Sequence, residues 1–385
     1  MSRRIALAAL VVLCTAAWLR AADDRPAGGA GNSIPVYIGT FTSGRSKGVY
    51  LMHMDAASGR LDEPMLVAEG KSPSFLVKHP TRPILYCVNE IDDYAGGKTG
   101  AVSAFQMEAD GKLALLNQQP SGGGGPTHLT IDPQGKHVLV ANYGTGSIAV
   151  LPLMPDGKLR PPSQIVQHEA GGQKVNRDGP HAHCINLDPS ARFALCCDLG
   201  LDKVFVYRFH ENGVLENGPV AKEPAGSGPR HLAFHPSGKF VYVINEIDST
   251  VTALAFDRDR GTLTNLQTLS TLPSGWKGEN TTAEIVMHPS GKWVYGSNRG
   301  HDSIAVFSVD QQTGRLTAAG HESTQGKAPR NFNLDPAGRF LLAANQDSDT
   351  VVVFRVDPAT GGLAPAGVTA HVPTPVCVLF VPPPR

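Results

Sequence analysis

The sequence has no excess of charge of either sign. Lysine and arginine total 34, aspartate and glutamate also total 34, and the formal net charge is zero. Nucleic-acid-binding domains usually carry a basic surface. This balance therefore argues against nucleic acid as a partner of the protein.

Cysteine is scarce, and its spacing matches no known framework. There are six cysteines in the chain, and Cys14 falls in a segment that we expect to be removed. The other five are odd in number and widely spaced, which excludes a regular set of disulfides. No C-x-x-C or histidine–cysteine pattern suggests zinc, so we predict no metal. Each of the five lies in an apolar run and is expected to be a buried thiol: Cys87, Cys184, Cys196, Cys197 and Cys377.

Long hydrophobic runs are missing except at the N-terminus. Arg3 and Arg4 precede an apolar stretch at residues 5–19, and the small residues Ala21 and Ala22 follow it. The stretch is too short to span a bilayer comfortably and is typical of a secretory signal. We predict a cleaved signal over residues 1–22, a flexible leader over 23–34 and one domain over 35–385; an N-terminal anchor is the alternative. The mature protein is expected to be periplasmic or secreted, without membrane contact, and cytoplasmic if the signal prediction is wrong.

Glycine and proline, by contrast, are plentiful, at 42 and 30 residues, and they separate short apolar runs that read as strands. One stretch recurs: "PRHLAFHPSGKFVYVINE", from Pro229. It contains a strand, a His-Pro turn and a second strand, which we call strands a and b. Further copies carry His-Pro or Asp-Pro at the same register and begin at Pro73, Pro126, Ala182, Thr282 and Pro329.

The spacing of the copies predicts the architecture. They recur at intervals of roughly 50 residues, and two more strands, c and d, follow each copy, which is typical of a β-propeller. "PVCVLFVP" near the C-terminus supplies a lone strand a, and the segment from Pro35 supplies strands b, c and d. We therefore predict an all-β protein, a seven-bladed β-propeller whose last blade is closed by N- and C-terminal strands.

One face of this propeller is expected to carry chemistry. The a–b and c–d turns are tight, whereas the d–a and b–c connections on the opposite face are longer and more polar, as ligand-binding loops often are. Six side chains at strand ends should surround one mouth of the channel on that face: His181, His183, Arg230, Glu246, Arg299 and Arg330.

The predicted mouth is rich in arginine, whose guanidinium group can form bidentate hydrogen bonds with carboxylate and phosphate. Glutamate and histidine beside the arginines could move a proton. A structural alternative is that Glu246 only forms ion pairs with Arg230 or Arg299. Strict strand alternation would direct His128 and His231 away from the channel. The asparagines that end each strand b are expected to bond turn backbone.

In these segments the sequence resembles the seven-bladed lactonase family, which includes the propeller type of 6-phosphogluconolactonase and the fungal carboxymuconate-lactonising enzyme. The matching pieces cover nearly all of the mature chain and include "YIGTFT", "DGPHAHCINLDP", "GPRHLAFHPSGKFVYVINE" and "HPSGKWVYGSNRG". The resemblance places the family's site on His183 or His181, Arg230, Glu246 and Arg299, the residues that the face argument selects.

The resemblance implies hydrolysis of a sugar lactone such as 6-phosphogluconolactone. Glu246 or His183 would be the base that activates water, Arg230, Arg299 and Arg330 would hold the anionic substrate, and no cofactor is needed. Because that phosphosugar is made in the cytoplasm, either the substrate is another lactone or the signal prediction is wrong. Alternatives are a muconolactone-type cycloisomerase and a non-catalytic propeller that binds a ligand or protein, although the 6% aromatic content argues against an aromatic binding rim.

Overall fold

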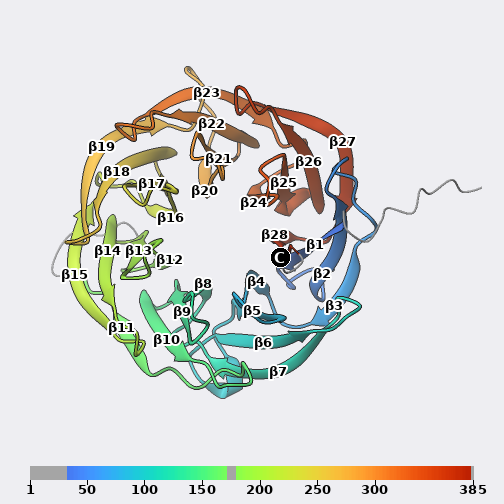
Figure 1. The fold of residues 1–385 in the computed structure, drawn as a ribbon, viewed down its shortest axis with the longest axis vertical. Helices are drawn as coiled ribbons and strands as arrows, with labels where there is room; N and C mark the ends of the chain where they lie inside the picture. Colours follow the sequence, from blue (N-terminus) through green and yellow to red (C-terminus); the bar gives the residue numbers. More distant parts are fainter. Residues whose placement is uncertain (1–32, 171–178, 383–385) are drawn as a thin grey trace, which may run out of the picture.

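In the computed structural model, which describes residues 33–170 and 179–382, seven four-stranded antiparallel sheets form a ring around a central axis (Figure 1). The seven-bladed propeller is thereby confirmed. We number the blades from β4, so that blade 1 holds β4–β7, blade 6 holds β24–β27, and blade 7 holds β28 with β1–β3. The predicted signal and most of the predicted leader lie outside the described residues.

The strands fall into four concentric positions. Position a, nearest the axis, holds β4 (Pro73–Lys78), β8 (Pro126–Ile131), β12 (Ala182–Leu187), β16 (Pro229–Phe234), β20 (Thr281–Met287), β24 (Pro329–Leu334) and β28 (Pro375–Phe380). Position b holds β5 (Ile84–Asn89), β9 (His137–Asn142), β13 (Phe193–Asp198), β17 (Phe240–Asn245), β21 (Trp293–Arg299), β25 (Phe340–Asn345) and β1 (Ser33–Thr40).

Positions c and d form the outer part of each blade. Position c holds β6 (Ala101–Met107), β10 (Ser147–Pro152), β14 (Lys203–Phe209), β18 (Thr250–Asp257), β22 (Ser303–Val309), β26 (Thr350–Val356) and β2 (Gly48–Asp55). Position d holds β7 (Leu113–Pro120), β11 (Gln164–Gln167), β15 (Leu215–Lys222), β19 (Thr262–Ser270), β23 (Leu316–Ser323), β27 (Leu363–His371) and β3 (Met65–Glu69). Two 3₁₀ turns lie in b–c loops, η1 (Tyr94–Gly96) and η2 (Gln346–Ser348).

The ring is closed by the two ends of the chain. β28 pairs with β1, from Val36 opposite Phe380 to Thr40 opposite Pro375. Closure of this kind leaves no free inner strand edge to attract another chain. The predicted closure by N- and C-terminal strands is therefore confirmed.

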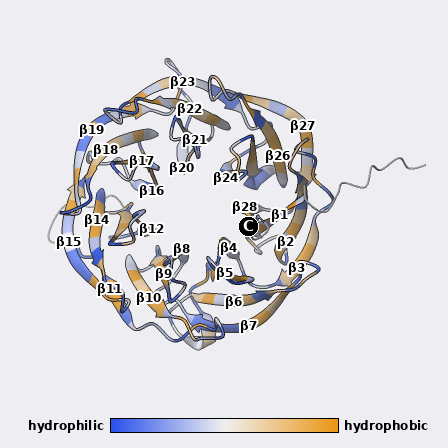
Figure 2. Ribbon diagram, viewed as in Figure 1, coloured by the Kyte–Doolittle hydropathy of each residue, from blue (hydrophilic) through white to orange (hydrophobic). Residues whose placement is uncertain are grey.

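Apolar side chains fill the seven interfaces between neighbouring blades. Seven buried clusters are found in the described residues, and each combines strands of two adjacent blades. Strand b is the most deeply buried, since all six residues of β5, β9, β13, β17 and β25 are buried. Figure 2 shows hydrophobic residues along the strands of every blade. The blades thus pack as sheets buried on both faces.

The repeated His-Pro turn has a structural purpose. His288, in the a–b turn of blade 5, bonds through Nε2 to the carbonyl of Gly338 in the next blade at 3.0 Å. His235 makes the same bond to Gly291 at 3.1 Å. Where the turn carries aspartate instead, as at Asp335, the carboxylate accepts backbone N–H groups of its own turn. Histidine therefore joins adjacent blades, and aspartate stabilises one turn.

Four of the asparagines that end strand b bind loop backbone, as predicted, whereas Asn245 donates to the hydroxyls of Thr250 and Thr252. Asn298 donates to the carbonyl of Thr271 at 2.8 Å, and Asn345 donates to that of Thr324 at 3.0 Å. In blade 3 the register holds Asp198, which instead binds the buried His168 at 2.6 Å. This register consequently anchors the d–a connections that surround the mouth.

The five cysteines of the described chain are free and buried, which confirms their interpretation as thiols that pack in the core. Burial raises the pKa of Cys87 and of Cys377 to about 12, so neither thiol ionises readily. Within the described residues, no helix has the length and apolar character needed to cross a membrane.

Candidate active site at the axial mouth

The innermost strands begin with a β-bulge. In β16, pairing with β17 passes from Pro229–Asn245 directly to His231–Ile244, so Arg230 has no partner in the ladder. Similar shifts occur at the start of β4, β8, β12, β20 and β24. A bulge re-aims side chains that would otherwise alternate. Arg230 and His231, although consecutive, both line the small cavity at the mouth.

Glu246, directly after β17, lies between two arginines. Its Oε2 accepts a hydrogen bond from Nε of Arg230 at 2.9 Å and lies 3.2 Å from Nη2 of Arg299. The arginines also donate to backbone carbonyls of β20, Arg230 to Ala283 at 2.7 Å and Arg299 to Thr282 at 2.8 Å. Glu246 thus forms both of the ion pairs considered as its structural alternative, and these contacts fix both guanidinium planes.

Arg330, from β24, lines the same cavity and has a weaker ion pair. Its Nη2 is 3.9 Å from Oε1 of Glu90, and its guanidinium carbon lies 4.9 Å from the ring centre of Phe41, a cation–π contact. Glu90 is a mouth residue that sequence reasoning passed over. It follows Asn89 in blade 1 just as Glu246 follows Asn245 in blade 4, so the repeat register could have identified it.

The two predicted histidines lie at different depths. His183 lines the mouth cavity and is buried, and its Nδ1 has no hydrogen-bond partner among the described residues. Its ring meets that of Tyr143 edge-on, with centroids 5.4 Å apart. His181 stacks on the Tyr143 ring, with ring centroids 4.4 Å apart, and its Nδ1 lies 2.9 Å from the Tyr143 carbonyl oxygen. His183 therefore faces the cavity, and His181 supports the wall behind it.

Burial and crowding of cations set the charge states at the mouth. Burial, with a contribution from the two other arginines, lowers the pKa of Arg230 to about 9. Burial likewise lowers the pKa of Arg299. Burial, followed by the nearby charge of Arg230, holds the pKa of His183 well below its usual range. At neutral pH the arginines are thus charged and His183 is a neutral imidazole.

A second layer of side chains closes the channel beneath the mouth. The rings of His128 and His231 are 5.3 Å apart, and Phe75 lies 6.0 Å from His231. These residues belong to β8, β16 and β4, which meet only near the axis (Figure 1). The expectation that His128 and His231 point away from the channel is therefore wrong, because the bulge cancels the alternation on which it rests. We call this layer the floor, and it also includes Glu284 and Asn331.

Glu223, directly after β15, is a buried carboxyl on the mouth face between blades 3 and 4. Its Oε2 accepts a hydrogen bond from Thr252 at 2.7 Å, whereas its Oε1 is buried without a partner in the described chain. Burial raises the pKa of Glu223, and Asp248 and Asp202 add to this effect. The ionised form of this group is therefore disfavoured in the folded protein.

We expect Glu223→Gln to stabilise the protein at pH 8. Because the pKa of Glu223 is higher in the folded than in the unfolded chain, folding stability falls as the pH rises through the interval between the two values. Removing the charge should recover on the order of 1 kcal/mol at pH 8. The gain should vanish below about pH 4, where the carboxyl is protonated in both states.

Thermal unfolding followed by circular dichroism at pH 8 and pH 4 measures this difference. Replacement of Glu211, which is exposed, by glutamine is the matched control and should shift neither midpoint. A lower midpoint for Glu223→Gln at pH 8 would contradict the assignment of Glu223 as a destabilising charge.

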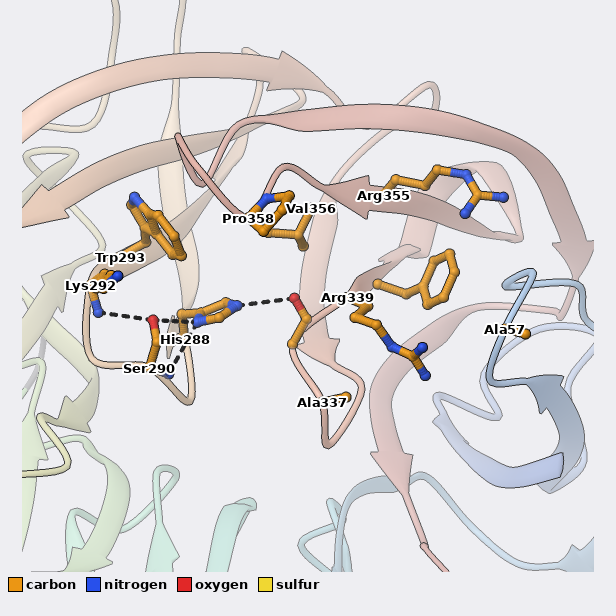
Figure 3. A pocket seen from close by; sticks show the side chains of 12 residues that line it. Ala57, His288, Ser290, Lys292, Trp293, Ala337, Arg339, Arg355, Val356 and Pro358 are labelled. Carbon is orange, nitrogen blue, oxygen red and sulfur yellow. Dashed lines mark hydrogen bonds between the residues drawn. The ribbon is translucent and has the colours of Figure 1, made fainter. Parts of the chain in front are cut away.

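A larger cavity, of about 500 Å³, lies on the opposite face, among the turns of blades 5, 6 and 7 (Figure 3). Arg339 and Arg355 line it, and each donates to a backbone carbonyl of the β2–β3 turn, that of Ala56 and that of Ser58 respectively. These arginines thus hold blade 7 against blade 6. No carboxylate from residues 33–170 or 179–382 lines this cavity, and the glutamates and histidines of the mouth lie on the other face.

Comparisons with known proteins agree with this architecture. The family profile described as "Lactonase, 7-bladed beta-propeller" matches residues 35–380. The chain is 36% identical over 346 residues to a 6-phosphogluconolactonase of Bacillus subtilis, covering 90% of this chain and 97% of the relative. It is 35% identical over 314 residues to a 6-phosphogluconolactonase of Formosa agariphila, covering 78% of this chain and 86% of the relative. The structure of a periplasmic gluconolactonase from Pseudomonas aeruginosa superimposes with a TM-score of 0.84 at 32% identity, covering 91% of this chain and 99% of the other.

Proposed function

This chain belongs to the seven-bladed β-propeller lactonase family, and on that premise we propose that its arginine-lined mouth hydrolyses a sugar lactone. Membership of this family identifies the protein as a lactonase. The finer assignment of substrate and residues is supported by one observation above all. Arg230, Arg330 and a neutral His183 with an unpaired ring nitrogen line one buried cavity, and Glu246 joins Arg299 to Arg230 beside it.

The arginines supply the anion-binding part of the reaction. Glu246 and the carbonyls of β20 hold Arg230 and Arg299 in place before substrate arrives. Hydrogen-bond donors fixed in advance stabilise the oxyanion that forms when water adds to the lactone carbonyl. Three arginines against Glu246 and Glu90 also leave a positive excess, which favours a substrate with an anionic group such as the phosphate of 6-phosphogluconolactone.

Glu246, His183 and His181 are the predicted proton-transfer residues. The water that attacks the carbonyl carbon must lose a proton, and the ring oxygen that leaves must gain one. Oε2 of Glu246 is already shared by two guanidinium groups, which favours a role in fixing the arginines. A neutral imidazole of the mouth therefore serves better as the base, and His183 has a ring nitrogen available for it.

The compartment bears on which lactone is the substrate. The apolar run after Arg3 and Arg4 supports export of the mature protein. The Pseudomonas aeruginosa relative is itself described as a periplasmic gluconolactonase. We therefore propose a periplasmic enzyme of carbohydrate metabolism, for which an unphosphorylated sugar lactone is the alternative to 6-phosphogluconolactone.

The test is acid release from three lactones, followed at constant pH. Purified mature protein should accelerate hydrolysis of gluconolactone or 6-phosphogluconolactone over the spontaneous rate, and a muconolactone should react poorly. Glu246→Gln should lower kcat/KM by roughly 100-fold, because the two arginines lose the charge that positions them. Turnover of the muconolactone alone would indicate the cycloisomerase, and no turnover of any lactone would leave a binding propeller.

A further inference from the structure

His231 and Glu284 form a buried pair in the floor of the mouth. Nδ1 of His231, from β16, lies 2.8 Å from Oε1 of Glu284, from β20. Glu284 also accepts the backbone N–H of Ile285 at 2.9 Å and the side-chain amide of Asn331 at 2.5 Å. Three hydrogen-bond donors thus meet on the carboxyl group of Glu284. The pair is a buried carboxyl group that holds one edge of an imidazole ring.

This contact determines which ring nitrogen of His231 can accept a proton. Because the Glu284 carboxylate is an acceptor, Nδ1 of His231 carries the hydrogen, and Nε2 keeps the lone pair. Nε2 is buried and has no hydrogen-bond partner in the described chain. His231 lines the cavity that His183, Arg230 and Arg330 also line. A basic nitrogen thus stands unpaired at the bottom of the proposed substrate site.

The surroundings of His231 differ from those of His183 in one decisive respect. Burial, with Arg230 and Arg330 nearby, lowers the pKa of His231, whereas Glu284 acts to raise it. For His183 the neighbouring charges are arginines and His231, all of which oppose a positive charge. Both rings are neutral at the start of a reaction. Once protonated, the His231 ring is stabilised by the carboxylate it touches.

We propose that His231, oriented by Glu284, is the general base of the hydrolysis, in place of Glu246 or His183. Nε2 of His231 takes a proton from water as the water oxygen bonds to the lactone carbonyl carbon, and the carbonyl oxygen becomes an oxyanion beside Arg230. The bond from that carbon to the ring oxygen then breaks. His231 returns its proton to the leaving oxygen, which yields a hydroxy acid. This inference rests on the proposed function.

Two roles remain for the residues displaced from the base position. His183, 5.1 Å from His231 between ring centres, can donate or accept a hydrogen bond to substrate while staying neutral. Glu246 fixes the arginines. Glu284 is a positioning residue, because it acts on substrate only through His231. Sequence reasoning missed it, although it is the only acidic side chain at its register among the six full repeats.

The experiment compares pH profiles of kcat for the wild type, Glu284→Gln and His231→Gln. In Glu284→Gln the glutamine oxygen can still accept from Nδ1, but the charge that stabilises the imidazolium is gone. We expect kcat to fall about 100-fold with KM little changed. The acid limb of the profile should move to lower pH, because the other charged and titratable groups facing the ring remain: His128, His183, Arg230 and Arg330. A merely structural glutamate would not move that limb.

His231→Gln removes the base and should abolish the acid limb while product binding, measured by calorimetry, persists. His128→Gln is the matched control, since His128 belongs to the same floor but touches no carboxylate in the described chain, and its acid limb should stay in place. If the wild type opens lactones and both His231→Gln and Glu284→Gln keep the wild-type profile, the base assignment is overturned and the lactonase proposal stands. If the wild type opens none, both proposals fall.

Discussion

Arg230→Ala should slow lactone hydrolysis by about 100- to 1,000-fold in kcat/KM, the usual cost of losing one fixed donor to an oxyanion. The side chain is only 3% exposed, and its contacts to Glu246 and Ala283 hold it in one orientation. A donor that needs no rearrangement contributes most in a site screened from water. Initial rates followed by acid release, over a range of substrate concentrations, measure the loss.

A buried arginine also contributes to folding, so stability must be measured alongside activity. Removing one partner of a buried ion pair can cost about 3–5 kcal/mol, although Arg299 remains to pair with Glu246. Arg230→Lys is the matched variant: it keeps the charge but loses the planar fork, and we expect intermediate activity. A folded Arg230→Ala protein with kcat/KM within threefold of the wild type would remove Arg230 from the site.

Removal of β28 should prevent the propeller from folding. A chain that ends at residue 373 lacks the strand that pairs with β1 and leaves that edge open. It also lacks Val378 and Phe380, which pack against blade 6, and Cys377, which packs against blade 1. Burial of each large apolar side chain contributes about 1.5–3 kcal/mol, and folded domains are stable by only about 5–15 kcal/mol.

Near-ultraviolet circular dichroism and resistance to a protease report this loss. A chain that ends at residue 382 keeps all of β28 and is the control, which should behave as the full-length protein. A compact, protease-resistant protein that ends at residue 373 would show that the ring closes with only three strands in blade 7. The prediction concerns folding alone and does not depend on the substrate.

Much of this fold can be predicted from the sequence because a propeller repeats one unit. The His-Pro or Asp-Pro register marks the same turn six times, and the number of copies with the two terminal strands gives seven blades. The stretch from Pro229 was expected to contain strands a and b, and β16 and β17 both lie within it. The repeat predicts the fold because each blade packs against its neighbours in the same way, so the strands of one blade indicate those of the others.

The site is only partly predictable, for a specific reason. Residues that break the repeat, such as His183, Arg299 and Glu246, can be picked out by comparing blades. The bulge cannot be recognised in the sequence, because the alternation of apolar and polar residues continues through it. His231 was therefore expected to face away from the channel. The contact between His231 and Glu284 is also hard to predict, because the two residues hold the same register in adjacent blades and the register alone does not show that their side chains meet.

The bulge places two consecutive positions of each innermost strand near the axis, where a regular strand would place one. In blade 4 these positions hold Arg230, in an upper ring, and His231, in a lower ring. Arg230 lies outside the ladder. The backbone hydrogen bonds between β16 and β17 therefore do not depend on which side chain occupies position 230. We propose that the upper ring meets substrate, and the other ring lies beneath it near the axis. On that proposal, substitutions in the upper ring would change specificity one blade at a time, while the lower ring would keep the base. The same blades would then recognise different lactones without a change in how they are assembled.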